Sequence, residues 1–261
     1  MAAENLIKHK MCTIIFWAKV GVLASQSISL ISTVVLARLL SPAEFGLIGM
    51  IAVFMMIGNV FANCGLGAAL VRKNRITLED ASTVFWFNLL LSVGIYILLF
   101  GVSGRIAEFF GYPILKPLIR VMALAIIFNA SGIVQGAYAQ IQLKFKETTI
   151  FHAIAGICAT TTAIWLAWHR FGVWSLIAHT LVASFITNLL LILFIRFRPY
   201  WRFSRKSFRE LISFGSSLLL VNFLDQTASN IHGAIIGKYY PVPNFWLLQK
   251  NPPLQLDNIF L

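Results

Sequence analysis

Seven apolar stretches, each about 20 residues or longer, dominate this sequence. They cover roughly residues 12 to 37, 45 to 71, 82 to 104, 118 to 139, 149 to 168, 173 to 195 and 211 to 236. A stretch of about 20 residues matches the hydrocarbon thickness of a bilayer, and in lipid a helix satisfies its own backbone hydrogen bonds. The sequence therefore predicts an all-α fold, a polytopic helical membrane protein.

Composition supports the membrane interpretation. Of the 261 residues, 59% are apolar and 11% are charged, and the mean hydropathy is +0.81. A soluble domain carries about 25% charged residues, so this chain lacks the charged surface that water requires. The first apolar run follows Lys8 and Lys10 but is too long for a signal peptide, which predicts an uncleaved first span. Cys12, Cys64 and Cys158 are isolated thiols without metal-ligand spacing, so we expect packing roles for them.

Basic residues indicate the orientation of the spans. Thirteen lysines and arginines lie before the first run and after the second, fourth and sixth, against five on the opposite side. Because cytoplasmic loops accumulate Lys and Arg, we expect a cytoplasmic N-terminus. The segment RFRPYWRFSRKSFR, residues 196 to 209, interleaves arginines with aromatic residues on this positive side. Contact with anionic membrane lipid explains it more simply than nucleic-acid binding, so no nucleic-acid partner is expected.

Two of the predicted helices carry a polar face. In the first, Lys19, Gln26, Ser29 and Thr33 share one side, which Gly21, Ser25 and Ser32 continue. Val20, Leu23, Leu30, Ile31, Val34 and Val35 form the opposite side. In the seventh, the polar residues are Asn222, Asp225, Ser229 and His232. We expect both helices to line one polar cavity.

Each ionisable residue inside a span has a structural alternative. Asp225 is the strongest functional candidate, because a charge in a span usually faces protein or water, but it also suits a structural pairing with a nearby lysine. Lys19 lies close enough to the boundary to reach the headgroups. His152 and His179 are single histidines on apolar helices, and hydrogen-bonded packing is the simpler reading of each. The adjacent Glu79 and Asp80 suit a helix N-terminus.

Two glycine pairs, Gly132 with Gly136 and Gly233 with Gly237, have the spacing that permits close helix contact. Motifs of soluble enzymes are missing from the sequence: it contains no HExxH, P-loop or GxSxG pattern. We therefore expect no enzyme activity, no cofactor and no metal site.

Four stretches in the right order resemble a known family. They are LARLLSPAEFG from Leu36 to Gly46, NCGLGAALVR from Asn63 to Arg72, IAEFFGYPIL from Ile106 to Leu115 leading to Arg120, and QLKFK from Gln142 to Lys146. Together they resemble bacterial Wzx-type polysaccharide flippases and exporters of the multidrug/oligosaccharidyl-lipid/polysaccharide superfamily. The colanic-acid-exporter branch is the nearest likeness, and the resemblance covers residues 13 to about 240.

The resemblance implies two lobes of six helices around a cavity that opens alternately to the two sides of the bacterial inner membrane. It implies transport of an undecaprenyl-diphosphate-linked oligosaccharide, coupled to a proton or sodium gradient. The substrate path would then include Lys19, Gln26, Arg38, Asn222, Asp225, Ser229 and His232. Lys19 and Arg38 are the nearest cations for a diphosphate.

The end of the sequence departs from this pattern. We expect a six-helix N-terminal lobe over residues 1–210, the first helix of a second lobe over 211–240, and a divergent tail over 241–261. If Phe245 to Lys250 are encoded as TTT TGG CTA TTA CAA AAA, reading one base later gives Phe-Gly-Tyr-Tyr-Lys, the family continuation. A frameshift near codon 241 is therefore our hypothesis, and one lobe is not expected to transport alone.

Two other functions remain open at this point. A multidrug or cation antiporter of the same superfamily shares the architecture. A membrane-embedded glycan-modifying enzyme would have to use His169 and Arg170 on a short loop.

Overall fold

The computed structural model describes residues 2–73 and 76–195, together with residues 200, 204, 205, 207–209, 211, 212, 215, 219–221 and 224. All regular structure in these residues is helical. Six segments are long and apolar enough to cross a membrane: Lys19–Leu39, Pro42–Asn63, Leu78–Phe110, Leu115–Ile141, Phe145–Trp168 and Val173–Phe194. The predicted all-α, multi-pass membrane fold is confirmed.

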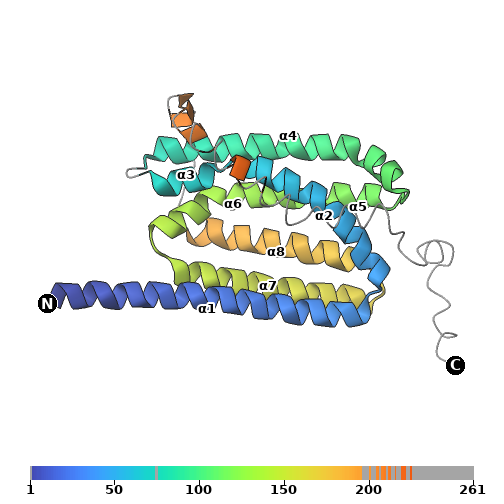
Figure 1. The fold of residues 1–261 in the computed structure, drawn as a ribbon, viewed down its shortest axis with the longest axis horizontal. Helices are drawn as coiled ribbons and strands as arrows, with labels where there is room; N and C mark the ends of the chain where they lie inside the picture. The colour runs from blue at the N-terminus through green and yellow to red at the C-terminus, as the bar shows by residue number, and fades with distance from the viewer. Residues whose placement is uncertain are drawn as a thin grey trace.

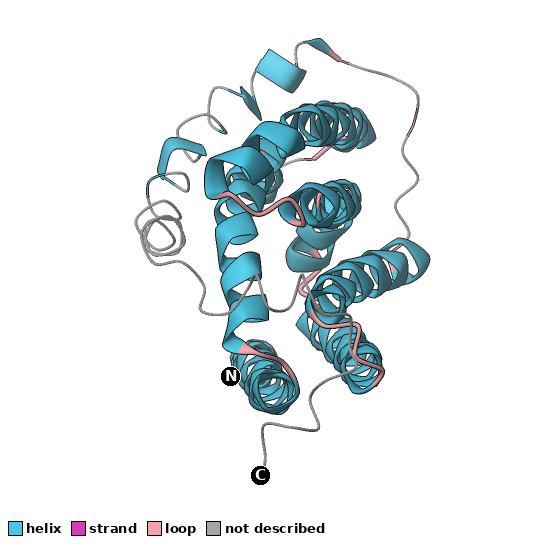
Figure 2. Cartoon of the chain, turned by 90° about the vertical axis from the view of Figure 1, so that its right-hand side faces the viewer, coloured by secondary structure: helices cyan, strands magenta, loops and turns pink. Residues whose placement is uncertain are grey.

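The described residues form eight helices. They are α1 (Ala2–Leu39), α2 (Pro42–Asn63), α3 (Leu66–Arg72), α4 (Leu78–Phe110), α5 (Leu115–Met122), α6 (Leu124–Ile141), α7 (Phe145–Trp168) and α8 (Val173–Phe194). Of these, the short α3 lies outside the six spans. The helices follow one another in space as α1, α7, α8, α6 and α4, and α2 crosses obliquely (Figure 1). Most of the long helices are seen end-on in Figure 2. α1 lies at one edge of the bundle, where it packs along α7.

Two of the predicted runs are interrupted. The run from 45 to 71 is not one helix, because Cys64 and Gly65 adopt left-handed backbone conformations with φ of 45° and 66° and separate α2 from α3. The run from 118 to 139 begins earlier, at Leu115, and divides at Ala123 into α5 and α6. Both breaks lie within apolar sequence that hydropathy reads as continuous.

The polar joints between spans act as helix caps. Pro42 occupies the first turn of α2, where its missing N–H costs nothing, and the Glu44 carboxylate accepts hydrogen bonds from the Ser41 backbone N–H (2.7 Å) and hydroxyl (3.0 Å). At α4 the Thr77 hydroxyl accepts from the Asp80 N–H, and the Asp80 carboxylate accepts from the Thr77 N–H, both at 3.1 Å. The expected capping role of the acidic pair before the third span is therefore confirmed for Asp80.

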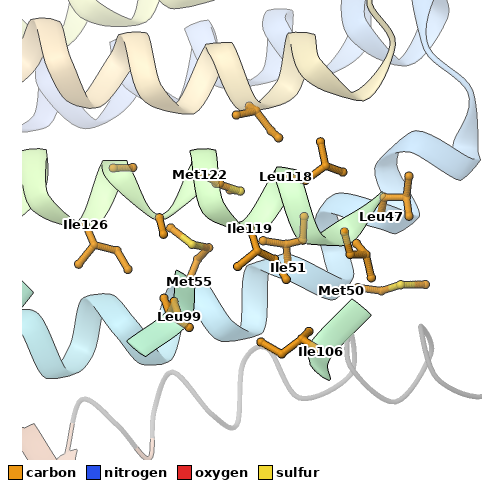
Figure 3. Packing of buried hydrophobic residues seen from close by; sticks show 14 of the residues in the cluster. Leu47, Met50, Ile51, Met55, Leu99, Ile106, Leu118, Ile119, Met122 and Ile126 are labelled. Atoms are coloured by element: carbon orange, nitrogen blue, oxygen red, sulfur yellow. The ribbon is translucent and has the colours of Figure 1, made fainter. Parts of the chain in front are cut away.

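The largest apolar cluster lies where α2, α4, α5, α6 and α8 meet (Figure 3). Ile51 and Met55 of α2 pack on Ile119 of α5 and Ile126 of α6. In lipid, such packing stabilises through close van der Waals contact, because the tails are as apolar as the side chains. This cluster holds α2 in place, whereas α1 contributes none of its residues.

The segment after α8 docks on α4. The Ser82 hydroxyl accepts a hydrogen bond from the Tyr200 N–H, and the Thr83 hydroxyl accepts one from the Ser204 N–H, both at 3.0 Å. The predicted seventh helix is described only at seven positions between 211 and 224, which are helical, so the proposed unit 211–240 remains a prediction. Asn222, Asp225, Ser229, His232, Gly233 and the tail 241–261 lie outside the described residues.

Candidate functional site: a polar groove along α1

The polar face of α1 divides into two parts. Ser32 is buried, and Gly21, Ser25 and Ser29 face a groove between α1, α7 and α8. The next flank of the helix carries Lys19, Gln26 and Thr33, which are exposed and do not line the groove.

The predicted apolar side of α1 is largely exposed, as expected for a surface that faces lipid. Leu23, Leu30, Ile31 and Val34 are exposed, as a lipid-facing stripe requires. Val20 and Val35 are only half-exposed, so they do not belong fully to that stripe.

The groove has a volume of about 570 Å³. Its lining comprises Gly21, Val22, Ser25, Ile28 and Ser29 of α1, Phe145, Thr148, Thr149, His152, Ala155 and Gly156 of α7, and His179, Ala183 and Thr187 of α8. The lining is mostly apolar, but it includes five serine or threonine residues and two imidazoles, and it lies within membrane-spanning segments.

Small residues bring α1 and α7 close together beside the groove. A Cβ added at Gly21 would lie 2.5 Å from the Thr149 hydroxyl, and one added at Gly156 would lie 3.1 Å from Cγ2 of Ile28. These contacts also fix the register, because Gly21 meets Thr149 and Ile28 meets Gly156 seven residues further along both helices. α1 and α7 therefore run parallel, and Ser25 lies at the level of His152.

Polar contacts hold α1 towards both ends of the groove. At one end, the Ser32 hydroxyl lies 3.3 Å from Nε2 of His179, which connects α1 to α8. At the other, the Thr149 hydroxyl donates to the Trp17 carbonyl at 3.4 Å, and the Lys146 ammonium lies 5.3 Å from the centre of the Trp17 ring. Ser32 is only 3% exposed, so its contact with His179 is shielded from the surroundings.

The two histidines differ from each other. His179 makes the hydrogen-bonded packing contact that the sequence favours. His152 is exposed within the groove, and no hydrogen bond of its ring is recorded among the described residues. Local spacing in the sequence does not show that residues 152 and 179 line one groove.

The predicted path residues that the structure describes, Lys19, Gln26 and Arg38, do not lie together. Lys19 and Arg38 are both exposed and lie 19 residues apart on one continuous helix. At 1.5 Å per residue this spacing is about 29 Å, so they cannot bind one diphosphate together. Gln26 lies beside the groove, between Ser25 and Ser29 along the helix.

The site shows no sign of metal chemistry in the part of the chain that is described. No group of three or more His, Cys, Asp or Glu side chains comes together there. Outside the spans, burial raises the pKa of the Cys64 thiol, which fits an unreactive packing residue.

These features define a multi-pass helical membrane protein with a polar groove at bilayer depth. The chain belongs to the polysaccharide biosynthesis protein family, whose model matches residues 35–245.

Several curated proteins are similar to the chain. A succinoglycan biosynthesis transport protein of Rhizobium meliloti is 26% identical over 80% of this chain and 43% of its own length. A lipopolysaccharide biosynthesis protein of Escherichia coli is 25% identical over 93% and 51%, and a teichuronic acid biosynthesis protein of Bacillus subtilis is 23% identical over 85% and 47%. The chain thus spans about half the length of these relatives. No solved structure matches it significantly.

Proposed function

We propose that this chain forms part of a transporter that moves a lipid-linked oligosaccharide or polysaccharide intermediate across the bacterial inner membrane. The observation that carries the proposal is the groove of α1, α7 and α8 within membrane-spanning segments, whose mostly apolar lining includes serine and threonine hydroxyls and two imidazoles. A glycan cannot cross hydrocarbon with its hydroxyls unpaired, and this groove supplies hydrogen-bonding side chains along its length. The succinoglycan relative is itself named a transport protein.

The proposal includes the finer features that the family resemblance implies. The lipid carrier is undecaprenyl diphosphate, transport uses a proton or sodium gradient, and the chain is not an enzyme. We further propose that the path includes Lys19 and Gln26 beside the groove and Arg38 in the last turn of α1. It would also include Asn222, Asp225, Ser229 and His232, which lie outside the described residues.

Photo-crosslinking tests the path directly. A benzophenone amino acid replaces Ser29, which lines the groove, or its neighbour Leu30, which is 65% exposed on the apolar side of α1. In cells that synthesise radiolabelled lipid-linked oligosaccharide, we expect a labelled adduct at position 29 and little at position 30. Equal adducts at both positions, or none at 29, would contradict the proposal.

Orientation has its own test in a variant without native cysteines. Cysteines replace Lys146, at the start of α7, and Trp168, at its end, both of which are exposed. With the N-terminus in the cytoplasm, an impermeant thiol reagent should label position 168 in intact spheroplasts and position 146 only after permeabilisation. The reverse pattern would invert the topology.

A further inference from the structure

The lining of the groove is mostly apolar, but it includes hydroxyl groups and two imidazoles and carries no fixed charge among its described residues. Among the described residues that line it, none is Asp, Glu, Lys or Arg. The polar groups are serine and threonine hydroxyls and two imidazoles, and Phe145 contributes an aromatic ring. Such a surface can donate and accept hydrogen bonds without supplying a counter-ion.

The nearest charged side chains do not line this surface. Lys19 of α1 is exposed on the flank beside the groove, and Lys146 of α7 lies over the Trp17 ring. Glu147 of α7 is exposed and is not part of the lining, and α8 carries no charged residue other than its titratable His179.

Hydrogen-bonding groups continue along the groove. Ser25 and His152 lie at one level, and the Ser32–His179 contact lies seven residues further along α1, which corresponds to about 10 Å. Ser29 of α1 lies between these levels. The volume of about 570 Å³ falls within the range of pockets that hold small ligands.

We infer that this groove is a binding site for uncharged sugar units. The exposed His152 imidazole hydrogen-bonds to one sugar hydroxyl, and the Ser25 oxygen, whose own proton is donated to the Val22 carbonyl at 2.9 Å, accepts from another. The inference rests on the proposed function and narrows its substrate to glycans whose units at this site are neutral. An acidic sugar would place a carboxylate at bilayer depth without a partner in this lining, which is strongly unfavourable.

Two probes that differ in one functional group test the inference. One is a polyprenyl-diphosphate-linked glucose, and the other is the same lipid carrying glucuronic acid, in which a carboxylate replaces the primary alcohol. Binding is measured with the full chain in phosphatidylcholine nanodiscs at pH 8, where an ordinary imidazole is uncharged. We expect the glucose lipid to bind more than tenfold more tightly than the glucuronate lipid.

Variants assign the effect to the groove. His152→Ala and, independently, Ser25→Ala should each weaken binding of the glucose lipid by about 3- to 10-fold, the value of one neutral hydrogen bond. His169→Ala is the matched control, because His169 is an exposed histidine just beyond the end of α7, outside the groove, whose Nδ1 contacts the Trp165 carbonyl. It should bind as the wild type does.

The outcomes separate the two proposals. Tight binding of both lipids, or glucose binding that neither groove variant weakens, would overturn the assignment of the groove and leave the proposed transport function standing. Failure of the wild-type chain to bind either lipid would refute the substrate class itself, and the groove assignment with it.

Discussion

The clearest stability prediction concerns two glycines on one helix. Gly132 and Gly136 have the spacing of a close-contact motif on α6, but the structure uses only the first. A Cβ at Gly132 would overlap the Oδ1 atom of Asn188 and lie 2.8 Å from its Cγ, whereas a Cβ at Gly136 would meet nothing within 4 Å. Gly132 therefore makes room for the Asn188 side chain of α8.

The two alanine substitutions should have opposite effects on the free energy of unfolding. Each gains about 1 kcal/mol of helix propensity. At Gly132 the overlap costs about 1–3 kcal/mol. Asn188 is only 7% exposed, and moving it also threatens its 2.7 Å hydrogen bond to the Ser184 carbonyl, worth about 0.5–1.5 kcal/mol. We expect Gly132→Ala to destabilise by about 1–3 kcal/mol and Gly136→Ala to stabilise by up to about 1 kcal/mol.

Unfolding in detergent, titrated with dodecyl sulfate, measures both variants. A third measurement identifies the cause: in an Asn188→Ala background, Gly132→Ala should no longer destabilise, because the overlapping atoms are gone. If Gly132→Ala and Gly136→Ala shift stability equally, or if the cost at Gly132 persists without Asn188, the packing explanation is wrong.

Three further substitutions test polar groups at and below the surface of the bundle. Asp80→Ala removes a 2% exposed carboxylate that lies 3.1 Å from the Lys73 ammonium and caps α4, so it should cost about 2–4 kcal/mol in the same unfolding assay. Glu147→Ala is the control, because Glu147 is an exposed acid in the first turn of α7 and its loss should change stability little. Similar losses in the two variants would contradict this prediction. Thr83→Val leaves the Ser204 N–H without its acceptor, so hydrogen exchange at the Ser204 amide, measured by mass spectrometry, should accelerate about 5- to 30-fold. Unchanged exchange protection at Ser204 would count against the docking contact. Asn88 is fully buried, and neither the Nδ2 nor the Oδ1 atom of its side chain has a hydrogen-bond partner among the described residues. Asn88→Leu should therefore leave the free energy of unfolding unchanged or raise it by about 1 kcal/mol. A clear loss of stability would mean that the amide has a partner.

The sequence predicts the spans well because their signal is compositional. A run of about 20 apolar residues has few alternatives to a membrane helix, and the proline, serine and acidic residues at the joints mark the caps at Ser41 and Thr77. The break at Cys64–Gly65 is harder to predict. Its residues are small and apolar, and only the left-handed backbone of the folded chain separates α2 from α3.

The groove shows that the local sequence pattern predicts a polar helix face but not the helices that pack against it. Helical periodicity places Lys19, Gln26, Ser29 and Thr33 on one side of α1, continued by Gly21, Ser25 and Ser32. In the structure only Gly21, Ser25 and Ser29 line the groove, Ser32 is buried, and the other three are exposed. Periodicity cannot name the neighbours, because these depend on how helices far apart in sequence pack together. The groove is completed by α7 and α8, whereas the expected partner helix near residue 225 lies outside the described residues.

The position of α1 links the fold to the groove. α2 is fixed by the large apolar cluster, whereas α1 packs along α7 through leucine, glycine and alanine contacts and meets α8 at the hydrogen bond between Ser32 and His179. Its exposed flank carries Lys19 and Gln26 within a membrane-spanning segment. Lys19 is the first residue of its span, where its ammonium reaches the headgroups, whereas the Gln26 amide lies seven residues further into the span. An amide without a hydrogen-bond partner is unfavourable in hydrocarbon, so this flank of α1 requires a polar neighbour at the level of Gln26.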